Sequence, residues 1–372
     1  MLEFYDYNFY MTEVLKLAER GKPYTLTNPL VGALIVKDDI IIGKGYHKKY
    51  GDLHAEINAI KDAEEKGESV EGSTLYVNLE PCCHYGKQGP CTQVIIDKKI
   101  KKVVIANVDP NPKVSGKGIR ILEDAGIEVV EGIMEEEGLK LNEDFFHYIK
   151  TNKPFVTLKS AMTLDGKISS ITGDSKWISS DVSRTYTHRL RAENNAIMVG
   201  IGTVLADDPL LNVRLEGDFV NPIKIILDSK LRIPIGAKLF SSSQALTIIA
   251  HSKDYDVKKY KILKEKKNVE LISLNYKDGF LDLEELMEKL RDFNICSILL
   301  EGGGNLNFSM LKGKLVDKVL FFIAPKFIGG KALSPVSGQG IKNMKDAIKL
   351  RDLQVEKMGP DVFVSGYIEK ED

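Results

Sequence analysis

The chain has 372 residues, of which 43% are hydrophobic and 28% charged, and its formal net charge is −1. This composition is ordinary for a globular protein, and the length favours two domains. No basic block marks a nucleic-acid track, which argues against a polynucleotide substrate. No apolar run approaches the roughly 20 residues that span a bilayer, and the N-terminus has no signal-peptide layout. We therefore expect a cytoplasmic protein that does not enter membranes.

Helical and strand patterns alternate over the first 145 residues or so. The expected elements are a helix around 11–18, strands at 33–36 and 40–42, a helix from residue 54, a strand at 74–79, a helix at 91–96, strands at 103–106 and 127–130, and a helix over 139–148. Such an alternation predicts an α/β sandwich.

A second unit is expected to begin near residues 150–154, a polar stretch that ends in Pro154. Its predicted strands are 155–159, 196–199, 223–227, 246–250, 269–272, 297–300 and 319–323, and its predicted helices include 181–193 and 283–291. Strands that alternate with helices imply a mainly parallel sheet, which binds its ligands at the carboxyl ends of the strands.

Potential metal ligands gather in the first unit. The chain has four cysteines, and Cys82, Cys83 and Cys91 lie within ten positions of one another. In a reducing compartment such a cluster indicates metal binding before it indicates disulfides. With His54 they offer the one-His, two-Cys set of catalytic zinc, and Glu56 suits a proton shuttle beside a zinc-bound water. The His-x-Glu and Pro-Cys pattern is typical of zinc-dependent nucleobase deaminases.

Cys82 and Cys83 compete for the same ligand role. Adjacent side chains point in different directions, so both can bind one ion only with strain. Cys82 directly follows Pro81 and is the predicted ligand. Cys296 stands in an apolar strand-like run and is expected to be a small core residue.

A glycine-rich turn stands out in the second unit. Residues 301–305, Glu-Gly-Gly-Gly-Asn, follow an apolar strand and precede a helical stretch at 306–311. Backbone amides at such a turn can approach a phosphate at a helix N-terminus. The turn can equally be glycine-rich for steric reasons, and no Rossmann GxGxxG fingerprint occurs in the chain.

Motifs from both halves resemble one known family. In the first half these motifs are residues 27–32, 54–56 and 79–91; in the second half they are 157–168, 173–179, 202–209 and 324–330. They closely resemble the bifunctional riboflavin-biosynthesis deaminase/reductase family. Deaminases in general have Pro-Cys-x-x-Cys, whereas Cys91 is nine positions after Cys82, a spacing found in the riboflavin branch. Cys83 departs from that family, which usually has serine there.

The resemblance implies a cytidine-deaminase-like α/β/α sandwich over residues 1–148 and a dihydrofolate-reductase-like α/β domain over 152–372. The first domain would use Zn²⁺, held by His54, Cys82 and Cys91, to deaminate 2,5-diamino-6-ribosylamino-4(3H)-pyrimidinone 5′-phosphate. Glu56 would be the general acid/base. The family positions around this substrate correspond to Asn28, His47, His84 and Lys87. Outside this motif, Lys87 would be read as a solvated loop lysine.

The second domain would use NADPH to reduce the ribosyl side chain to ribityl. The resemblance places the substrate at Lys159, Ser175, Arg191, Leu211, Arg214 and Glu301. It places NADPH at Ala161, Trp177, Thr203, Asp207, Ser229, Gly303, Gly304, Asn305, Leu306, Asn307 and Phe308. Arg191 and Arg214 could clamp the substrate phosphate, and Lys159, Asp207 and Glu301 are unranked candidates for proton transfer. Trp177 could instead be a core residue, and Asp207 could instead cap a turn. A homodimer through the reductase domains is also expected.

Three other hypotheses about the function stay open. A polynucleotide-editing deaminase would need a basic, aromatic-lined groove that this near-neutral chain does not display. The second half could be a degenerate nucleotide-binding or dimerisation module, in which case it would not bind NADPH. A reductase with a purely structural zinc would keep every activity after Glu56→Gln.

Overall fold

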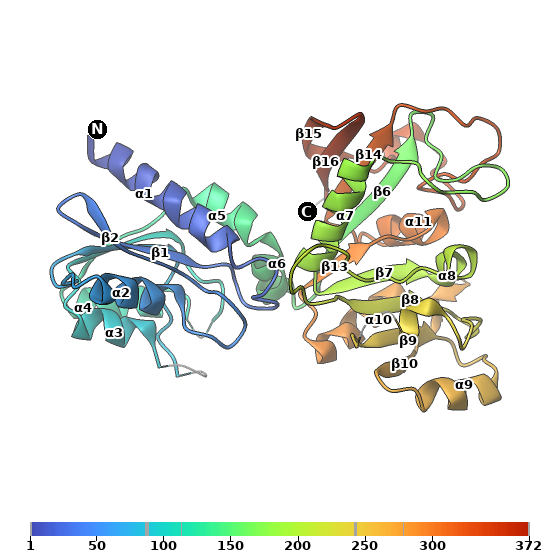
Figure 1. The fold of residues 1–372 in the computed structure, drawn as a ribbon. Helices are drawn as coiled ribbons and strands as arrows, with labels where there is room; N and C mark the ends of the chain where they lie inside the picture. Colours follow the sequence, from blue (N-terminus) through green and yellow to red (C-terminus); the bar gives the residue numbers. More distant parts are fainter. Residues whose placement is uncertain (1, 86–88, 113, 242–243, 278, 371–372) are drawn as a thin grey trace. The chain divides into compact units, whose positions relative to one another are not determined.

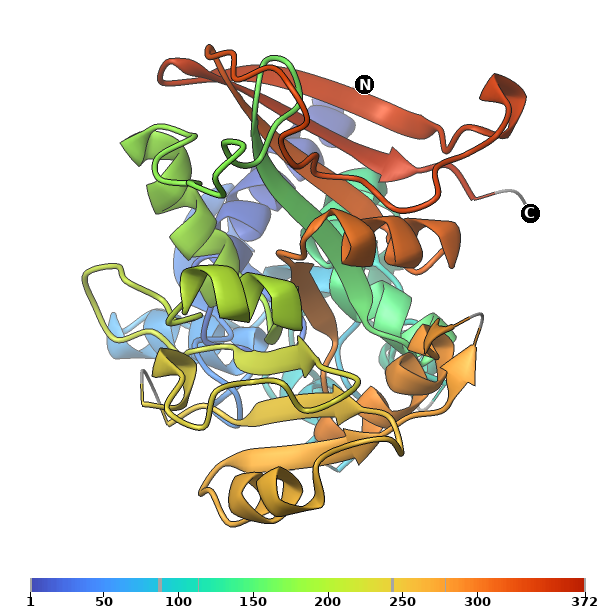
Figure 2. The same cartoon turned by 90° about the vertical axis from the view of Figure 1, so that its right-hand side faces the viewer.

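The computed structural model describes residues 2–85, 89–112, 114–241, 244–277 and 279–370. The chain forms two compact units, residues 1–152 and 153–372, which are drawn in Figures 1 and 2. No helix in the described part of the chain is long and apolar enough to cross a membrane.

The N-terminal unit is built on a five-stranded sheet with the order β2-β1-β3-β4-β5. The strands are β1 (Gly32–Lys37), β2 (Ile40–Tyr46), β3 (Thr74–Leu79), β4 (Lys102–Asn107) and β5 (Glu128–Val130). β1 runs antiparallel to β2 and β3, whereas β3, β4 and β5 run parallel. The carboxyl ends of β3 and β4 therefore meet at the same edge of the sheet.

Helices cover both faces of this sheet. α1 (Leu2–Glu19) and α5 (Glu135–Leu141) lie on one face, and α2 (Ala55–Glu65), α3 (Cys91–Asp97) and α4 (Lys117–Asp124) lie on the other (Figure 1). Alternate residues of β1 point into two separate hydrophobic cores, with Ala33 and Ile35 beneath α2 and Leu34 and Val36 beneath α1. The expected three-layer sandwich is confirmed.

Small residues let α2 approach β2 closely. A Cβ atom at Gly45 would lie 2.3 Å from the Ala55 carbonyl oxygen and 2.3 Å from the Ala59 amide nitrogen. Only glycine therefore fits at this position while the helix stays in place. The close approach fixes the first turn of α2, which carries Glu56 and follows His54 directly.

The predicted elements of this unit match the structure except at three helices. The helix predicted around 11–18 is longer and begins at Leu2. The single helix predicted over 139–148 is two helices, α5 and α6 (Glu143–Thr151). They are separated by Asn142, whose buried amide oxygen accepts the Leu30 amide proton at 2.7 Å. The sequence did not predict α4, because Gly118, Ile119 and Leu122 are its only buried residues and give too short an apolar pattern.

The C-terminal unit contains a nine-stranded sheet with the order β10-β9-β8-β7-β13-β6-β14-β16-β15. Its strands are β6 (Phe155–Thr163), β7 (Ala196–Gly200), β8 (Ile223–Leu227), β9 (Thr247–His251), β10 (Val269–Ser273), β13 (Ser297–Leu300), β14 (Lys318–Ala324), β15 (Leu350–Met358) and β16 (Asp361–Ile368). The strands from β10 to β14 in this order run parallel. β16 and β15 complete the sheet as an antiparallel ribbon at one edge, drawn in red in Figure 2.

Helices also lie along this larger sheet. They are α7 (Asp181–Glu193), α8 (Ile201–Asp207), α9 (Val257–Lys264), α10 (Leu283–Lys289) and α11 (Gly304–Lys312), with short 3-10 turns at Lys238–Phe240, Leu290–Phe293 and Met344–Asp346 and a small hairpin of β11 (Tyr276–Lys277) and β12 (Phe280–Leu281). Residues of β7 alternate between two cores, one packed against α10 and α11 and the other against α8 and α9.

The predicted strands of the parallel sheet are all present, with ends that differ by a few residues. β15 and β16 were not predicted. Almost every residue of β15 is exposed, so this strand lacks the apolar alternation by which a half-buried strand is recognised.

Candidate functional sites

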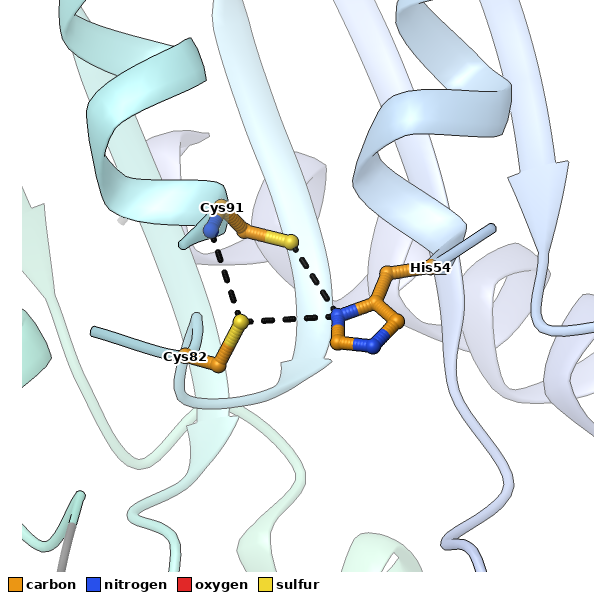
Figure 3. Close-up of side chains that lie close together, drawn as sticks. All are labelled: His54, Cys82 and Cys91. Carbon is orange, nitrogen blue, oxygen red and sulfur yellow. Dashed lines mark hydrogen bonds between the residues drawn. The ribbon is translucent and has the colours of Figure 1, made fainter. Parts of the chain in front are cut away.

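Three ligand groups converge at the N-terminal ends of two helices in the N-terminal unit. His54 directly precedes α2, Cys91 is the first residue of α3, and Cys82 lies in the loop after β3. Their ligand atoms all lie within 4.8 Å of one another. His54 Nδ1 is 3.4 Å from Cys82 Sγ and 3.3 Å from Cys91 Sγ, and the Cys91 amide donates to Cys82 Sγ at 3.4 Å (Figure 3).

This donor set fits zinc. Tetrahedral zinc, with Zn–S of about 2.3 Å and Zn–N of about 2.0–2.1 Å, holds a sulfur and a nitrogen ligand about 3.6 Å apart. The sulfur to Nδ1 distances of 3.3 and 3.4 Å are close to that spacing. One imidazole and two thiolates leave a fourth position for a substrate or water. Cys83 does not join this group of described residues.

The charges of the group suit a cation. Hydrogen bonding with Cys91, reinforced by His54, lowers the pKa of the Cys82 thiol well below its usual value. Hydrogen bonding to Cys82 raises the pKa of His54 to about 9, so a bound metal would displace the proton that the ring otherwise shares with the Cys82 thiolate. Burial, followed by the charge of Cys82, raises the pKa of Glu56, whose side chain is only 4% exposed. Glu56 is therefore a buried carboxyl group that can hold and release a proton.

A cavity of about 240 Å³ opens beside these residues. Its wall contains the ligands His54 and Cys82 and, from the residues expected to bind substrate, Asn28, His47 and His84. Lys87, also expected there, lies outside the described residues.

The imidazole of His47 has a defined tautomer. Its Nδ1 is 3.1 Å from the Leu53 carbonyl oxygen, which can only accept, so Nδ1 carries the proton. Nε2 then accepts from the Asn28 amide at 3.0 Å. Burial lowers the pKa of His47, which keeps the ring neutral. His47 therefore orients Asn28 at the cavity wall.

The cavity wall also contains eight residues that were not predicted as site residues. They are Pro29, Val31, Ala55, Leu79, Glu80, Asp109, Asn111 and Phe145. Asp109 and Asn111 follow the carboxyl end of β4, where side chains of neighbouring parallel strands meet. That rule could have identified these two residues. Phe145 comes from α6, and no sequence signal links it to the site. Burial raises the pKa of Asp109 to about 6.

A largely buried charge cluster marks the C-terminal unit. Lys159 in β6, Arg191 in α7 and Glu301 after β13 come together, each with a side chain 12–13% exposed. Arg191 donates from Nε and Nη2 to the two carboxylate oxygens of Glu301, at 2.7 and 3.0 Å. Lys159 Nζ is 3.8 Å from Glu301.

The protonation states of this cluster follow from its geometry. Although burial works in the opposite direction, the charges of Arg191 and Lys159 lower the pKa of Glu301 to about 2. Burial lowers the pKa of Lys159. Two cations thus surround one carboxylate, and the excess positive charge suits an anionic ligand.

The loop that holds Leu211 and Arg214 is fastened to α7. The Arg214 amide donates to His188 Nδ1 at 3.3 Å, and Arg191 Nη1 donates to the Asn212 carbonyl oxygen at 3.3 Å. Burial, followed by the charges of Arg191 and Arg214, lowers the pKa of His188 to about 4, so the ring is neutral at pH 7. The sequence did not indicate His188. Arg191 thus donates both to Glu301 and to this loop, and its role as a phosphate clamp stays a prediction.

Several residues expected at NADPH lie around the Gly303 turn and the loop after β6. A Cβ atom at Gly303 would be 3.8 Å from Thr203 Oγ1. Asp207 Oδ1 accepts from the hydroxyl of Ser175, a residue expected at the substrate, at 3.4 Å. The indole of Trp177 is 64% exposed, and the Arg184 guanidinium stacks over it at 4.4 Å. Trp177 is thus available to a ligand and is not a core residue.

The other residues expected at NADPH have mixed surroundings. Ala161 lies in β6 opposite Phe322, and the Ser229 carbonyl oxygen accepts from Ser252. Gly304 begins α11 and its carbonyl oxygen accepts from Ser337.

The remaining residues expected at NADPH lie in α11. Leu306 packs near Gly302, and Asn307 is buried and donates to the Pro335 carbonyl oxygen at 2.8 Å. Asn305 and Phe308 line a separate cavity of about 690 Å³ beside β12 and α10.

Comparison with known proteins assigns each half of the chain to a protein family. Residues 5–107 match the cytidine and deoxycytidylate deaminase zinc-binding region, and residues 154–364 match the RibD C-terminal domain. The chain is 45% identical to riboflavin biosynthesis protein RibD of Aquifex aeolicus over 355 residues, which cover 95% of this chain and 96% of the relative. The chain belongs to the RibD family.

Other RibD proteins support this assignment over nearly the whole chain. RibD of Escherichia coli is 36% identical over 366 residues, 95% of this chain and 97% of the relative. The structure of Acinetobacter baumannii RibD is 34% identical and covers 99% of this chain and 100% of its own, with a TM-score of 0.87. A Thermotoga maritima diaminohydroxyphosphoribosylaminopyrimidine deaminase/5-amino-6-(5-phosphoribosylamino)uracil reductase is 37% identical and covers 98% of this chain and 99% of its own, with a TM-score of 0.86.

Membership in the RibD family confirms the expected family, fold class and type of enzyme. The protein is a bifunctional deaminase and reductase of riboflavin biosynthesis. Its N-terminal half contains the zinc-binding region of a deaminase, and its C-terminal half is a reductase domain of an NADPH-dependent family.

Proposed function

We propose that this RibD protein catalyses two consecutive reactions on one pyrimidine nucleotide. Residues 1–148 would hydrolyse the ring amino group of 2,5-diamino-6-ribosylamino-4(3H)-pyrimidinone 5′-phosphate. Residues 152–372 would then reduce the ribosyl side chain with NADPH and give 5-amino-6-ribitylamino-uracil 5′-phosphate. The observation that carries the proposal is the His54, Cys82 and Cys91 group beside buried Glu56, in one chain with the Lys159, Arg191 and Glu301 cluster.

In the deaminase site, His54, Cys82 and Cys91 would hold the metal. Bound zinc supplies a Lewis acid that brings the pKa of water near 7. The Glu56 carboxylate accepts a proton from the attacking water and returns it to the ring amino nitrogen, which leaves as ammonia. Such proton transfer is typically worth about 100- to 10,000-fold in rate. Asn28, held by His47, and His84 would bind the substrate from the cavity wall.

In the reductase site, bound NADPH would supply hydride chemistry, and C1′ of the opened, imine-like sugar would be the acceptor. The excess positive charge around Glu301 would attract the substrate phosphate, and Arg214 would bind it from the loop that α7 holds. Glu301 is ionised at neutral pH, because its pKa is about 2. We therefore assign the proton donated during reduction to Lys159, whose burial makes its ammonium a stronger acid.

The cofactor would lie over the turn before α11. Thr203 and Gly303 adjoin there, Asp207 ends α8, and the loop after β6, which contains exposed Trp177, reaches Asp207 through Ser175. The three amides at the start of α11 could bind an NADPH phosphate.

The test supplies the diamino pyrimidinone phosphate with and without NADPH and follows ammonia and product mass. Ammonia should appear without NADPH, and side-chain reduction should require it. Glu56→Gln should lower ammonia release by at least about 100-fold while leaving reduction of pre-deaminated substrate intact. Glu65→Gln, at an exposed position of the same helix, is the matched control. Release of neither product by the wild type would refute the assignment.

We further propose that the protein is a cytoplasmic homodimer joined through its reductase domains. A reducing compartment keeps thiolate ligands available. The edge strand β15 exposes Leu353 (58%) and Val355 (61%), as a strand that pairs with a second copy would. Sedimentation of the wild type should give the dimer mass, and Val355→Lys should shift the mass toward the monomer.

A further inference from the structure

Glu80 stands at the end of β3, directly before Pro81. Its side chain is buried, with an exposed fraction of 3%. The carboxylate accepts backbone amide protons from a distant part of the chain, namely Asp109 at 3.2 Å, Gly116 at 2.9 Å, Gly118 at 2.9 Å and Ile119 at 3.3 Å. One buried carboxylate thus joins the end of β3 to the loop after β4 and to the start of α4.

The charge of Glu80 is balanced by the backbone. Among the described residues, no lysine, arginine or histidine side chain forms an ion pair with the Glu80 carboxylate. α4 has Gly116 before its first turn and no side-chain cap of its own. Gly118 and Ile119 are the second and third residues of that helix, so Glu80 occupies the place of an N-cap. The positive end of the helix stabilises the carboxylate.

The fit between α4 and the Glu80–Pro81 segment is close. A Cβ atom at Gly118 would lie 2.3 Å from the Pro81 carbonyl oxygen and 3.0 Å from Glu80 Oε1. Any larger residue would push α4 away from the backbone that leads into Cys82. Hydrogen bonds and packing therefore fix the same short segment.

Glu80 reaches two parts of the deaminase site. Cys82 follows it by two positions, and its backbone carbonyl oxygen also accepts the Thr92 amide proton of α3 at 3.2 Å. On the other side, the amide that donates to Glu80 belongs to Asp109, whose own carboxylate accepts the Asn111 amide proton at 2.8 Å. Asp109 and Asn111 both line the cavity.

We infer that Glu80 is a positioning residue of the deaminase, which holds the Cys82 ligand in place and sets the Asp109–Asn111 wall of the substrate cavity. This inference rests on the proposed function for its kinetic part, but not for its metal-binding part. Residues that orient metal ligands typically contribute about 10- to 100-fold in metal affinity or activity.

The experiment compares Glu80→Gln, Glu80→Asp and Ser73→Ala in the full-length protein. Glutamine keeps the size of the side chain but replaces one acceptor oxygen with an NH2 group. That group is a donor and cannot accept the backbone amide protons that face it. Aspartate keeps the charge and shortens the reach. Ser73 is also buried and donates to the Val70 carbonyl oxygen at 2.6 Å, but it lies at the opposite end of β3. Ser73→Ala thus reports the effect of lost stability alone.

Zinc affinity, measured by competition with a chromogenic chelator, should fall about 10- to 100-fold in Glu80→Gln, less in Glu80→Asp, and not in Ser73→Ala. At saturating zinc, KM for the diamino substrate should stay raised in Glu80→Gln, because the Asp109–Asn111 wall is displaced. The reductase rate in the same preparations should be unchanged, because Glu80 lies outside the C-terminal unit. A retained calorimetric transition of the N-terminal unit should show that this unit is folded.

A purely structural role predicts a different result. Glu80→Gln would then lose thermal stability as Ser73→Ala does, but its zinc affinity would stay within about twofold of that of the wild type. Its KM and kcat at saturating zinc would also equal those of the wild type. This result would overturn the inference. If Glu80→Gln does not fold, wild-type zinc affinity in Glu80→Asp would overturn it equally. Failure of the wild type to release ammonia would refute the proposed function, but the zinc measurements would still decide the role of Glu80.

Discussion

At the scale of single residues, the reductase site depends on how Arg191 holds Glu301. The two nitrogens of its planar fork meet both carboxylate oxygens, and a lysine ammonium cannot reproduce that geometry. Arg191→Lys should lose one charge-assisted hydrogen bond, worth about 1.5–3 kcal/mol, and kcat/KM of reduction should fall about tenfold to a hundredfold. Arg189→Lys, at an exposed position of the same helix, is the control. An unchanged rate in Arg191→Lys would show that the fork is dispensable.

The same pair gives the reductase unit an acid-sensitive contribution to stability. The pKa of Glu301 is about 2 in the folded protein, against a usual value of 4.5. Because the folded value is depressed, this contribution is complete above pH 4.5 and is lost as pH falls toward 2. Unfolding of Arg191→Lys, followed against pH, should show a smaller loss over that interval than the wild type.

Residue types explain why part of the deaminase site could be predicted from the sequence. His54, Cys82 and Cys91 are the ligands that zinc prefers, and the structure brings them together with Glu56 beside them. Asp109 and Asn111 carry no such signature, since aspartate and asparagine before prolines are also common in turns. They reach the cavity only because β3 and β4 pair in parallel.

At the scale of elements, α2 owes its position to the glycines of β2. Gly45→Ala would place a Cβ atom 2.3 Å from the Ala55 carbonyl oxygen, and overpacking of this kind typically costs about 1–3 kcal/mol. We expect a lower melting temperature of the N-terminal unit. Weaker ammonia release should accompany it, because the displaced first turn carries Glu56. Reduction should be unaffected.

The control for that substitution is Gly236→Ala. Gly236 lies in open space, with no atom within 4 Å of an added Cβ. Calorimetry and the two activities should be the same as in the wild type. Equal melting temperatures for Gly45→Ala and the wild type would mean that α2 shifts without cost.

Helices and strands could be predicted from the sequence where their burial requires a regular pattern of apolar residues. β13 (Ser297–Leu300) is buried throughout and reads as an apolar run, and it was predicted with the correct ends. β15 lies at the sheet edge, where β16 alone pairs with it, and its sequence gives no period. β15 is therefore a strand because it pairs with β16, and its local sequence does not indicate a strand.

At the scale of the whole molecule, the two compact units should respond separately to loss of zinc. If zinc binds the folded N-terminal unit and not the unfolded chain, it stabilises that unit by about 4 kcal/mol when its concentration is 1,000 times the dissociation constant. A chelator should therefore lower the melting temperature of one calorimetric transition, that of residues 1–152, and abolish ammonia release. The melting temperature of the second transition and the reductase rate should stay unchanged. Cys82→Ser should remove the response to chelator, whereas Cys296→Ser, a substitution at a buried residue of the other unit, should retain it. A chelator that shifts both transitions together would show that the two units unfold as one, and the separation of the two activities into independent domains would then be wrong.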